Sequence, residues 1–329
     1  MTPKFAVYMS MTNNCYTPTY LTLQSLGTAL QNQHTRLFFV ADGTTDPKCL
    51  ELFHSHAFKE KFGINQQTVK LIQFTQREGI APCLNYVLQQ LEPDEDLLII
   101  PNTTIFERNF LEPLFRVAYQ ESYSQTVFCV SATPVGFPSH FQDIYDHFVT
   151  IPFLRGIEPN QGMEILQHFF KTSLQKSLQE TLQNQIEQNQ NQVIAGDLGT
   201  VCYFKSPCFH QVGFFDERCA YDSRGNPGGY GEEWDYSSRI TQLEKLSLFA
   251  KDSTFWLLAR GFSSGGESEI SKQERQNRFN RKYSGELWVK MGTFLQRVLK
   301  VQEKQEYVIV GKYLYPQHHS IFEVRHANE

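Results

Sequence analysis

Short apolar runs and amphipathic stretches alternate along the first hundred residues of the chain. The apolar runs have the length and composition of buried strands, at 5–9, 37–40, 69–74 and 97–100. Between them, leucines repeat on one helical face from 21 to 30, and a later helix is expected from about 82 to 91. Asp46 and Pro47 have the composition of a helix start. Strands that alternate with helices predict an α/β fold, with a doubly wound, mainly parallel sheet flanked by helices.

The second half of the chain continues this pattern less regularly. Further strands are expected at 126–131, 199–204, 254–258 and, at the edge of the sheet, 306–314. Helices are expected at 107–119, at 207–212, from Glu232 onward and, in a basic stretch, at 271–291. Because ligands of such sheets bind at the carboxyl ends of the strands, we expect the loops after Met9, Val40 and Ile100 to share one functional edge.

Residues 162–194 form a long segment rich in glutamine and asparagine. Its front half is amphipathic, whereas QNQIEQNQNQ at 184–193 is low in complexity. An insertion, a surface helix and a dimer contact all fit this composition. We assign the segment no catalytic role.

Composition and charge narrow the class of protein. The formal net charge is -5 and no run of lysine or arginine dominates, so nucleic acid is not an expected partner. No run reaches the ~18 to 20 apolar residues of a membrane span, and the N-terminus MTPKFAVYMS lacks the pattern of a signal peptide. Seven scattered cysteines without a C-x-x-C pair predict reduced, mostly buried thiols. These features predict a cytoplasmic protein, with peripheral membrane association left open.

The most informative stretch is VGFFDERCAYDSRGNPGGYGEEWDYSSR at 212–239. A glycine-rich, aromatic loop leads into a helix that begins near Glu232 with acidic residues in its first turn. Complementing the helix dipole would explain the acids alone. It does not explain the lead-in GNPGGYG or Arg239 one turn further on. The stretch therefore favours a functional site.

This stretch resembles the acceptor-side block of family 2 glycosyltransferases of the nucleotide-diphospho-sugar (GT-A) fold, in which v-G-x-F-D-E leads to E-D-x-D-x-x-x-R. The matching residues are Gly213, Phe215, Asp216, Glu217, Glu232, Glu233, Asp235 and Arg239. By this resemblance, Glu233 falls on the base that deprotonates the acceptor hydroxyl in inverting enzymes. Glu232 and Asp235 are the neighbouring catalytic acids that the resemblance implies.

The same loop and helix supply candidates for binding the acceptor. Tyr221, Tyr230 and Trp234 present aromatic faces on which a sugar could stack. Packing in the core is the alternative for each of these side chains.

Donor-side segments of the same family fall earlier in the chain, in the expected order. ADGTTD at 41–46 is similar to the family's D-D-G-S-T-D, which implies that Asp42 accepts a hydrogen bond from the nucleotide base; a turn with an Asx cap is the alternative. SMTNN after the first strand implies that Ser10 and Thr12 line the base pocket. REGIAPCLN at 77–85 is similar to Asn-x-Gly-x-x-x-x-Asn, with Gly79 and Asn85 in register; a loop glycine and a helix cap are the alternatives. Glycine in that segment lets the backbone approach the donor.

The metal motif D-x-D is the main departure from the family. Pro101, Asn102 and Thr103 occupy its positions, and no histidine occurs between 210 and 318 to complete a metal site. Carboxylates are the usual ligands of Mg²⁺ and Mn²⁺; no cofactor is assigned with certainty, and either ion is left open although its usual ligands are missing. We expect Asn102 and Thr103 to face the ribose and diphosphate.

Cationic side chains near the end of the resemblance offer a substitute for the metal. Guanidinium groups bind phosphate well, and the candidates are Arg260, Arg275, Arg278 and Lys282. A basic, solvent-facing helix is the alternative reading of this region.

Together these segments imply an inverting glycosyltransferase that moves a sugar from a nucleotide-diphosphate donor to a glycan or lipid-linked acceptor, in bacterial surface polysaccharide assembly by family analogy. The expected divisions are a nucleotide-sugar-binding half at 1–120, an acceptor-binding half at 121–265 with an insertion at about 160–195, and a helical extension at 266–329. A catalytically inactive relative that binds glycan or nucleotide, or serves as a scaffold, is the alternative because D-x-D is missing. A dehydrogenase is disfavoured, since no G-x-G-x-x-G follows an early strand.

Overall fold

The structure is a computed structural model of the chain. The described residues are 3–11, 16–31, 33–43, 47–54, 58–64, 67–120, 124–135, 193–196, 198, 200–220, 232–257 and 309–310. The amphipathic front half of the 162–194 segment and the expected basic helix at 271–291 lie outside them.

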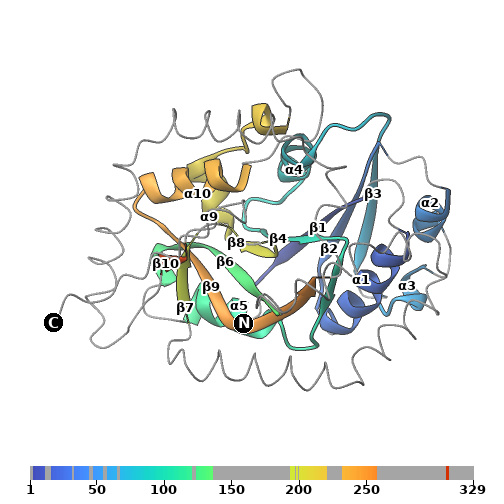
Figure 1. Ribbon diagram of the computed structural model, residues 1–329, viewed down its shortest axis with the longest axis horizontal. Helices are drawn as coiled ribbons and strands as arrows, with labels where there is room; N and C mark the ends of the chain where they lie inside the picture. Colours follow the sequence, from blue (N-terminus) through green and yellow to red (C-terminus); the bar gives the residue numbers. More distant parts are fainter. Residues whose placement is uncertain are drawn as a thin grey trace, which may run out of the picture.

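The described strands form one ten-stranded sheet that runs across the molecule (Figure 1). Its order is β10-β7-β9-β6-β8-β4-β1-β2-β3, with β5 paired to β9. The strands are β1 (Phe5–Met11), β2 (Arg36–Asp42), β3 (Thr68–Phe74), β4 (Asp96–Pro101), β5 (Thr104–Phe106), β6 (Val127–Val135), β7 (Val193–Gly196), β8 (Cys202–Phe204), β9 (Leu246–Leu257) and β10 (Ile309–Val310).

The first half of the chain builds the parallel part of this sheet. β3, β2, β1 and β4 are parallel neighbours, with Tyr8 opposite both Phe38 and Ile99. Their carboxyl ends therefore meet at one edge, as the sequence predicts. β8 then runs antiparallel between β4 and β6, and β9 pairs parallel with β6 but antiparallel with β7 and β5. The fold is the expected α/β class, and each antiparallel pair includes β8 or β9 from the second half of the chain.

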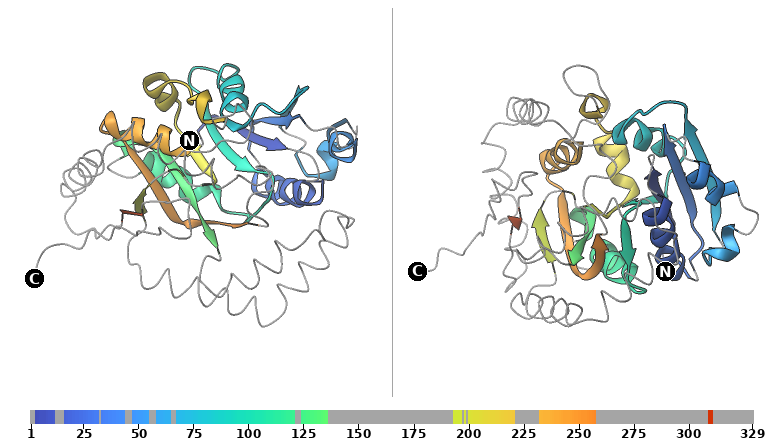
Figure 2. Two further views of the ribbon diagram at one scale, coloured as in Figure 1. Left: turned by 45° about the horizontal axis from the view of Figure 1, so that its top comes forward. Right: turned by 45° about the vertical axis from the view of Figure 1, so that its right-hand side comes forward.

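Helices cover both faces of the sheet. They are α1 (Tyr16–Ala29), α2 (Pro47–His54), α3 (Phe58–Lys61), α4 (Ile80–Leu88), α5 (Leu111–Phe115), α9 (Ser206–Val212) and α10 (Glu232–Gln242). Buried residues of α1, α2, α3 and α5 share one core cluster, and those of α4, α9 and α10 share the other. Figures 1 and 2 show the two groups on opposite faces of the sheet.

Strand β1 contributes to both clusters because its side chains alternate between the faces. Phe5, Val7 and Met9 lie in the first cluster, whereas Ala6 and Tyr8 lie in the second. A strand buried on both faces has a continuous apolar sequence, which is the pattern in FAVYMSM.

Several element boundaries differ from the sequence prediction. The helix expected at 107–119 is the short α5, followed by a π-helical turn at Arg116–Gln120. Pro113 has no N–H to bond the Asn109 carbonyl, so the helix does not extend back across that turn. α4 begins at Ile80, which places Pro82 in its first turn, where proline is tolerated. β9 begins at Leu246 rather than Thr254 because it pairs with β6 along the whole length of that strand.

Three further sequence predictions concern the start of α2, the cysteines and membrane-spanning helices. α2 begins at Pro47 as expected, while the expected cap at 46 lies outside the described residues. Five cysteines are buried thiols outside any disulfide, namely Cys49, Cys83, Cys129, Cys202 and Cys208. Within the described residues, no helix is long and apolar enough to cross a membrane.

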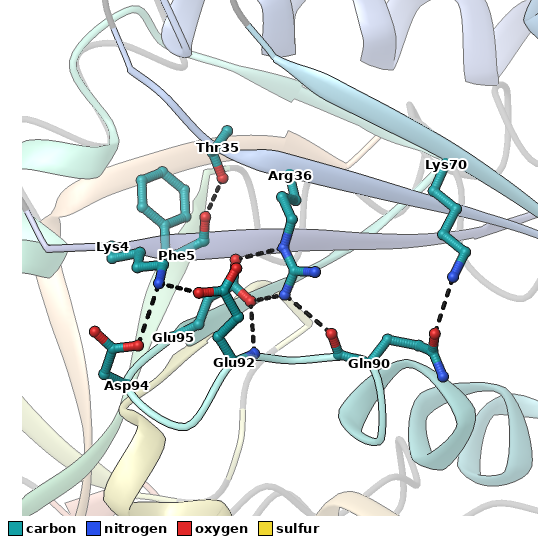
Figure 3. Close-up of polar contacts among 9 residues, drawn as sticks. All are labelled: Lys4, Phe5, Thr35, Arg36, Lys70, Gln90, Glu92, Asp94 and Glu95. Carbon is teal, nitrogen blue, oxygen red and sulfur yellow. Dashed lines mark hydrogen bonds and ion pairs between the residues drawn. The ribbon is translucent and has the colours of Figure 1, made fainter.

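The amino-terminal edge of the parallel strands is held by a charged network (Figure 3). Arg36, at the start of β2, forms an ion pair with Glu95 and donates to the Gln90 carbonyl at 3.0 Å. Glu95 also accepts from the backbone N–H of Glu92 at 3.1 Å. Lys4 pairs with Glu92 and, at 3.2 Å, with Asp94 in the same network. These contacts tie β1, β2 and the loop before β4 together.

Candidate functional site

The carboxyl edge of β2 ends in a buried carboxylate that organises the neighbouring loop. Asp42 is 5% exposed. Its Oδ1 accepts the backbone N–H of Glu78 at 2.6 Å, and its Oδ2 accepts that of Gly79 at 3.1 Å. These N–H groups lie at the entry to α4, where a helix leaves its first donors unsatisfied. Asp42 therefore caps α4 from a distant strand rather than closing its own turn.

Two glycines allow this loop to approach the strand end. Gly43 has φ +65°, and a Cβ there would lie 2.5 Å from the backbone nitrogen of Arg77. Gly79 has φ 93° at the N-cap of α4. Only glycine adopts these backbone angles without strain. The two positions keep the N–H groups aimed at Asp42.

A buried hydroxyl and a buried thiol lie next to Asp42. Burial raises the pKa of the Cys83 thiol, and the nearby Asp42 carboxylate raises it further. Burial also raises the pKa of the Tyr8 hydroxyl, and electrostatic interactions with Cys83, Asp42 and Glu232 raise it further, while a hydrogen bond with Ser10 lowers it. Tyr8 comes from β1, Cys83 from α4 and Glu232 from α10. The hydroxyl of Tyr8 thus lies among residues of four elements.

Helix α10 directs its first residues toward this place. Glu232, Tyr236 and Ile240 are one helical turn apart and are 2%, 0% and 0% exposed, so they form the face that packs on the sheet. Glu233 is half-buried beside them. Among the described residues, its Oε2 is buried and makes no hydrogen bond.

Asp235 is held differently from the two glutamates. Arg239, one turn later, donates from Nε to Asp235 Oδ2 at 2.8 Å. Arg239 also donates from Nη1 to the Val212 carbonyl at 2.9 Å. Asp235 thereby anchors α10 to the end of α9, and its charge is neutralised by Arg239.

Asn85 joins the two segments that carry the family resemblance. Its Nδ2 donates to the Phe215 carbonyl and to Glu217 Oε1, both at 2.9 Å. Its Oδ1 accepts the backbone N–H of Phe215 at 2.8 Å. Asn85 is 4% exposed. It positions the 212–217 segment against α4 and is not a helix cap.

Hydrogen bonds to α1 hold Asn102, one of the residues at the D-x-D positions, and Thr104, which follows them. Asn102 and Thr103 are 4% and 5% exposed, and Asn102 Nδ2 donates to Thr19 Oγ1 at 3.0 Å. One turn along α1, Thr22 Oγ1 accepts the backbone N–H of Thr104 at 3.0 Å. Hydroxyls on one helical face therefore fix the chain after β4.

These residues do not fit a divalent metal ion of the usual kind. An amide nitrogen engaged with Thr19 and a threonine replace the carboxylates that Mg²⁺ or Mn²⁺ prefers. In the part of the chain that the structure describes, no group of three His, Cys, Asp or Glu side chains could hold a metal.

Several predicted site residues cannot be placed. Thr12, Tyr221, Tyr230, Arg260, Arg275, Arg278 and Lys282 lie outside the described residues. Trp234 lies in α10, but its side chain is not among those described. Ser10 is half-buried at the carboxyl end of β1, on the same face as Tyr8.

The sequence prediction missed Tyr8 and Cys83. Both stand inside apolar runs, FAVYM and IAPCL, which read as core. The signal for Tyr8 is its spacing, because it precedes Ser10 by two residues and so shares its face of the strand. Nothing in the sequence signals that Cys83 lies beside Asp42.

No protein-family model and no curated protein matches the sequence. Solved structures with a similar fold include GalNAc-T7 with UDP, GalNAc and Mn²⁺, at 12% identity and a TM-score of 0.53, covering 92% of this chain. The chain spans 52% of the length of that structure.

Two further similar structures have TM-scores of 0.49. They are the mannosyltransferase PcManGT from Pyrobaculum calidifontis with GDP-Man and Mn²⁺, at 10% identity over 93% of this chain and 77% of that one, and S. aureus TarS 1–349 with UDP-GlcNAc, at 14% identity over 92% and 77%. The likeness to GalNAc-T7 and the strand order agree, and the chain has a GT-A-like α/β fold.

Proposed function

We propose that this protein is an inverting glycosyltransferase that moves a sugar from a nucleotide-diphosphate donor to a hydroxyl of a glycan or lipid-linked acceptor. One observation carries the proposal. Glu233 opens a helix at the carboxyl edge of the parallel strands and keeps one buried carboxylate oxygen without a hydrogen bond from the described residues. A carboxylate so placed can accept a proton from an incoming hydroxyl.

In the proposed reaction Glu233 is the general base. Its Oε2 takes the proton of the acceptor hydroxyl while the hydroxyl oxygen attacks the anomeric carbon of the donor sugar. The new C–O bond forms on the face opposite the C–O bond to the leaving diphosphate, so the configuration inverts. Glu232 and Asp235 position the helix, the first by its burial and the second through Arg239.

The donor would lie along the ends of β1, β2 and β4. Asp42 has both oxygens fixed by backbone N–H groups, and each oxygen has a further lone pair for an N–H of the base. Ser10 and Thr12 would line the base pocket, with Gly79 allowing close approach and Asn102 and Thr103 near the ribose and diphosphate. GDP-Man and UDP-GlcNAc in structures of similar fold accord with a donor of this class.

In this proposal Arg260, Arg278 and Lys282 neutralise the negative charge of the leaving diphosphate. The support is the chemistry at Asn102 and Thr103, which lack carboxylates. Cationic side chains can bind and neutralise a diphosphate without a metal. The proposed enzyme is therefore independent of Mg²⁺ and Mn²⁺.

The missing carboxylates also favour a second candidate function. A relative that binds a nucleotide sugar or glycan without turning it over, or that serves as a scaffold, would retain Asp42 and the fold. The free carboxylate oxygen of Glu233 weighs against this candidate, since a binding protein needs no base.

The test is a donor screen followed by an assay of transfer. UDP-, GDP- and dTDP-sugars are screened by thermal shift with and without Mn²⁺, and those that bind are assayed for hydrolysis and transfer. We expect binding and turnover in the presence of a chelator. Strict dependence on Mn²⁺ would overturn the metal-independent reaction. If the protein binds a donor but hydrolyses and transfers none of those tested, the second candidate function is established.

A further inference from the structure

Helix α10 carries the proposed base in its first turn but is fixed in its second turn. The Oε2 of Glu233 is buried and makes no hydrogen bond with the described residues. The place of this carboxylate therefore depends on the backbone of α10, and so on the contacts that hold the helix. A misplacement of about 1 Å can cost about 100-fold in rate. The contacts in question meet residues 212–215, which we call the brace.

Helix α10 grips the brace through two side chains. Arg239 donates from Nη1 to the Val212 carbonyl at 2.9 Å, and the Tyr236 hydroxyl donates to the Gly213 carbonyl at 2.8 Å. The ring of Tyr236 also stacks on that of Phe215, with centroids 4.0 Å apart and planes 18° apart. Apolar packing alone is non-directional. The two hydrogen bonds therefore fix where α10 stands along the brace.

Helix α4 grips the same brace through one buried side chain. Asn85 accepts the backbone N–H of Phe215 at 2.8 Å and donates to the Phe215 carbonyl at 2.9 Å. Its Nδ2 carries a second proton, which it donates to Glu217 Oε1 at 2.9 Å. Asn85 thus pairs with both polar backbone groups of one residue, as a neighbouring strand would. The brace cannot move along α4 without breaking both of these bonds.

Helix α4 is in turn fixed at the donor edge. The backbone N–H groups of Glu78 and Gly79, at its entry, bond Asp42. Asn85 follows Gly79 by six residues, which is about 9 Å along a helix. Both α4 and α10 also approach the turn at Glu217–Ala220, directly after the brace. A continuous series of contacts therefore joins the carboxylate that ends β2 to the helix that carries the proposed base.

We propose that Asn85 is a positioning residue that acts through the brace. It sets where the first turn of α10, with Glu233, stands relative to the donor edge. Asn85 itself touches neither substrate in this proposal. The inference rests on the proposed function for its catalytic consequence, whereas the link between the two helices can be tested without it.

Hydrogen exchange measured by mass spectrometry tests the link without any assay of activity. In Asn85→Ala, the amides of 232–242 are expected to exchange about 10-fold faster than in wild type, although the substitution lies in α4. Gln67→Ala is the matched control, because Gln67 is also a buried amide and bonds two backbone carbonyls, those of Leu30 and Gln33, just beyond α1. The control should leave exchange in α10 unchanged. Unchanged exchange of α10 in Asn85→Ala, or equal acceleration in both variants, would overturn the proposal.

Kinetics test the positioning role from the other side of the brace. Tyr236→Phe removes the hydroxyl that bonds the Gly213 carbonyl and keeps the aromatic ring, so it disturbs the fold less than Asn85→Ala does. We expect kcat to fall about 10-fold while the KM for the donor stays within about twofold, because a displaced base affects the chemical step more than binding. Gln67→Ala should lower the melting temperature and leave kcat unchanged.

The double variant Asn85→Ala/Tyr236→Phe shows whether the two residues act through the same segment. Once one grip on the brace is lost, the other has less to hold, so the fall in kcat should be clearly smaller than the product of the two single effects. Falls that multiply in full would overturn the proposal.

These measurements separate the inference from the proposed function. If the wild-type protein turns over no donor, the proposed function fails, while hydrogen exchange still decides whether Asn85 fixes α10. If turnover is present and Tyr236→Phe keeps the kcat of wild type, the positioning role is overturned and the proposed function stands.

Discussion

The two edges of the parallel sheet use buried carboxylates in different ways. At the amino-terminal edge, Glu95 is paired with Arg36, and Asp96 accepts from two tyrosine hydroxyls and the backbone N–H of Ser206. At the carboxyl edge, Asp42 is fixed by backbone N–H groups, and Glu233 keeps a buried oxygen that no described residue bonds.

This difference separates structural from reactive carboxylates. An acid that is saturated by a cation and by hydroxyls stabilises the fold but has little capacity for a ligand. An acid oriented by backbone groups, or left with an open oxygen, can accept a further hydrogen bond or a proton. The comparison predicts that similar substitutions at the two edges will affect different properties.

The largest expected effect is on catalysis at Glu233. Glu233→Gln keeps the shape of the side chain but removes the base, and we expect kcat to fall by about 10³-fold with an unchanged melting temperature. The matched change at the other edge is Glu95→Gln, which weakens the ion pair with Arg36. That variant should lose stability and keep its kcat. A Glu233→Gln protein with wild-type kcat would remove the distinction between the edges.

The next effect is on stability at Arg36. Arg36→Ala leaves Glu95 buried, with its side chain 2% exposed, and without its cation. We expect a loss of about 3 kcal/mol in the free energy of unfolding, measured by urea denaturation. Lys4→Ala is the control, because its ion pairs are exposed and such pairs contribute little. Equal losses in the two variants would contradict a specific role for the buried pair.

The sequence alone predicts the carboxyl edge of the parallel strands, which carries Asp42 and Glu233, better than it predicts the amino-terminal edge. Apolar runs predict the four parallel strands, and the ends of those strands predict where Asp42 lies. The acids of α10 are predicted to belong to a functional site because they follow a glycine-rich, aromatic loop that complementing the helix dipole does not explain. These features are local, so each can be read within a few residues.

The structural contacts are not local, and this is why the sequence does not reveal them. Asn85 and Phe215 are 130 residues apart, and Asp96 and Tyr203 are 107 apart. The apolar pattern around a residue indicates that its side chain is buried, but its hydrogen-bond partner depends on the order of strands in the sheet. The contact of Asp42 with the loop before α4 is of this kind, which explains why the sequence alone leaves a local turn as the alternative interpretation of ADGTTD.

A smaller effect is expected at Gly43, where the backbone holds the reactive edge together. Gly43→Ala places a Cβ 2.5 Å from the Arg77 nitrogen at a φ of +65°. The loop must shift, and the N–H groups of Glu78 and Gly79 move away from Asp42. We expect about 2 kcal/mol of lost stability and weaker donor binding.

The control for Gly43 is Gly63→Ala. Gly63 has φ +68°, but a Cβ there meets nothing within 4 Å. Gly63→Ala should therefore show only the cost of the left-handed backbone, about 1 kcal/mol, with normal donor binding by thermal shift. Weaker donor binding in both variants would mean that the contact of Asp42 with the N–H groups of Glu78 and Gly79 does not determine donor binding.

The smallest expected effect is the pH dependence contributed by Asp96. Burial raises the pKa of Asp96 above its usual value, although hydrogen bonds from Tyr119, Tyr203 and Ser206 oppose the shift. The folded state therefore binds the proton more tightly than the unfolded state, and stability falls as the pH rises from about 4 through the raised pKa. Asp96→Asn removes this titration. Urea unfolding of both proteins from pH 3.5 to 7 should show that the advantage of wild type over Asp96→Asn is greatest at the lowest pH and shrinks as the pH rises. A difference that stays constant over this range would show that Asp96 keeps its ordinary pKa, and that even a saturated carboxylate at this edge costs the fold nothing to ionise.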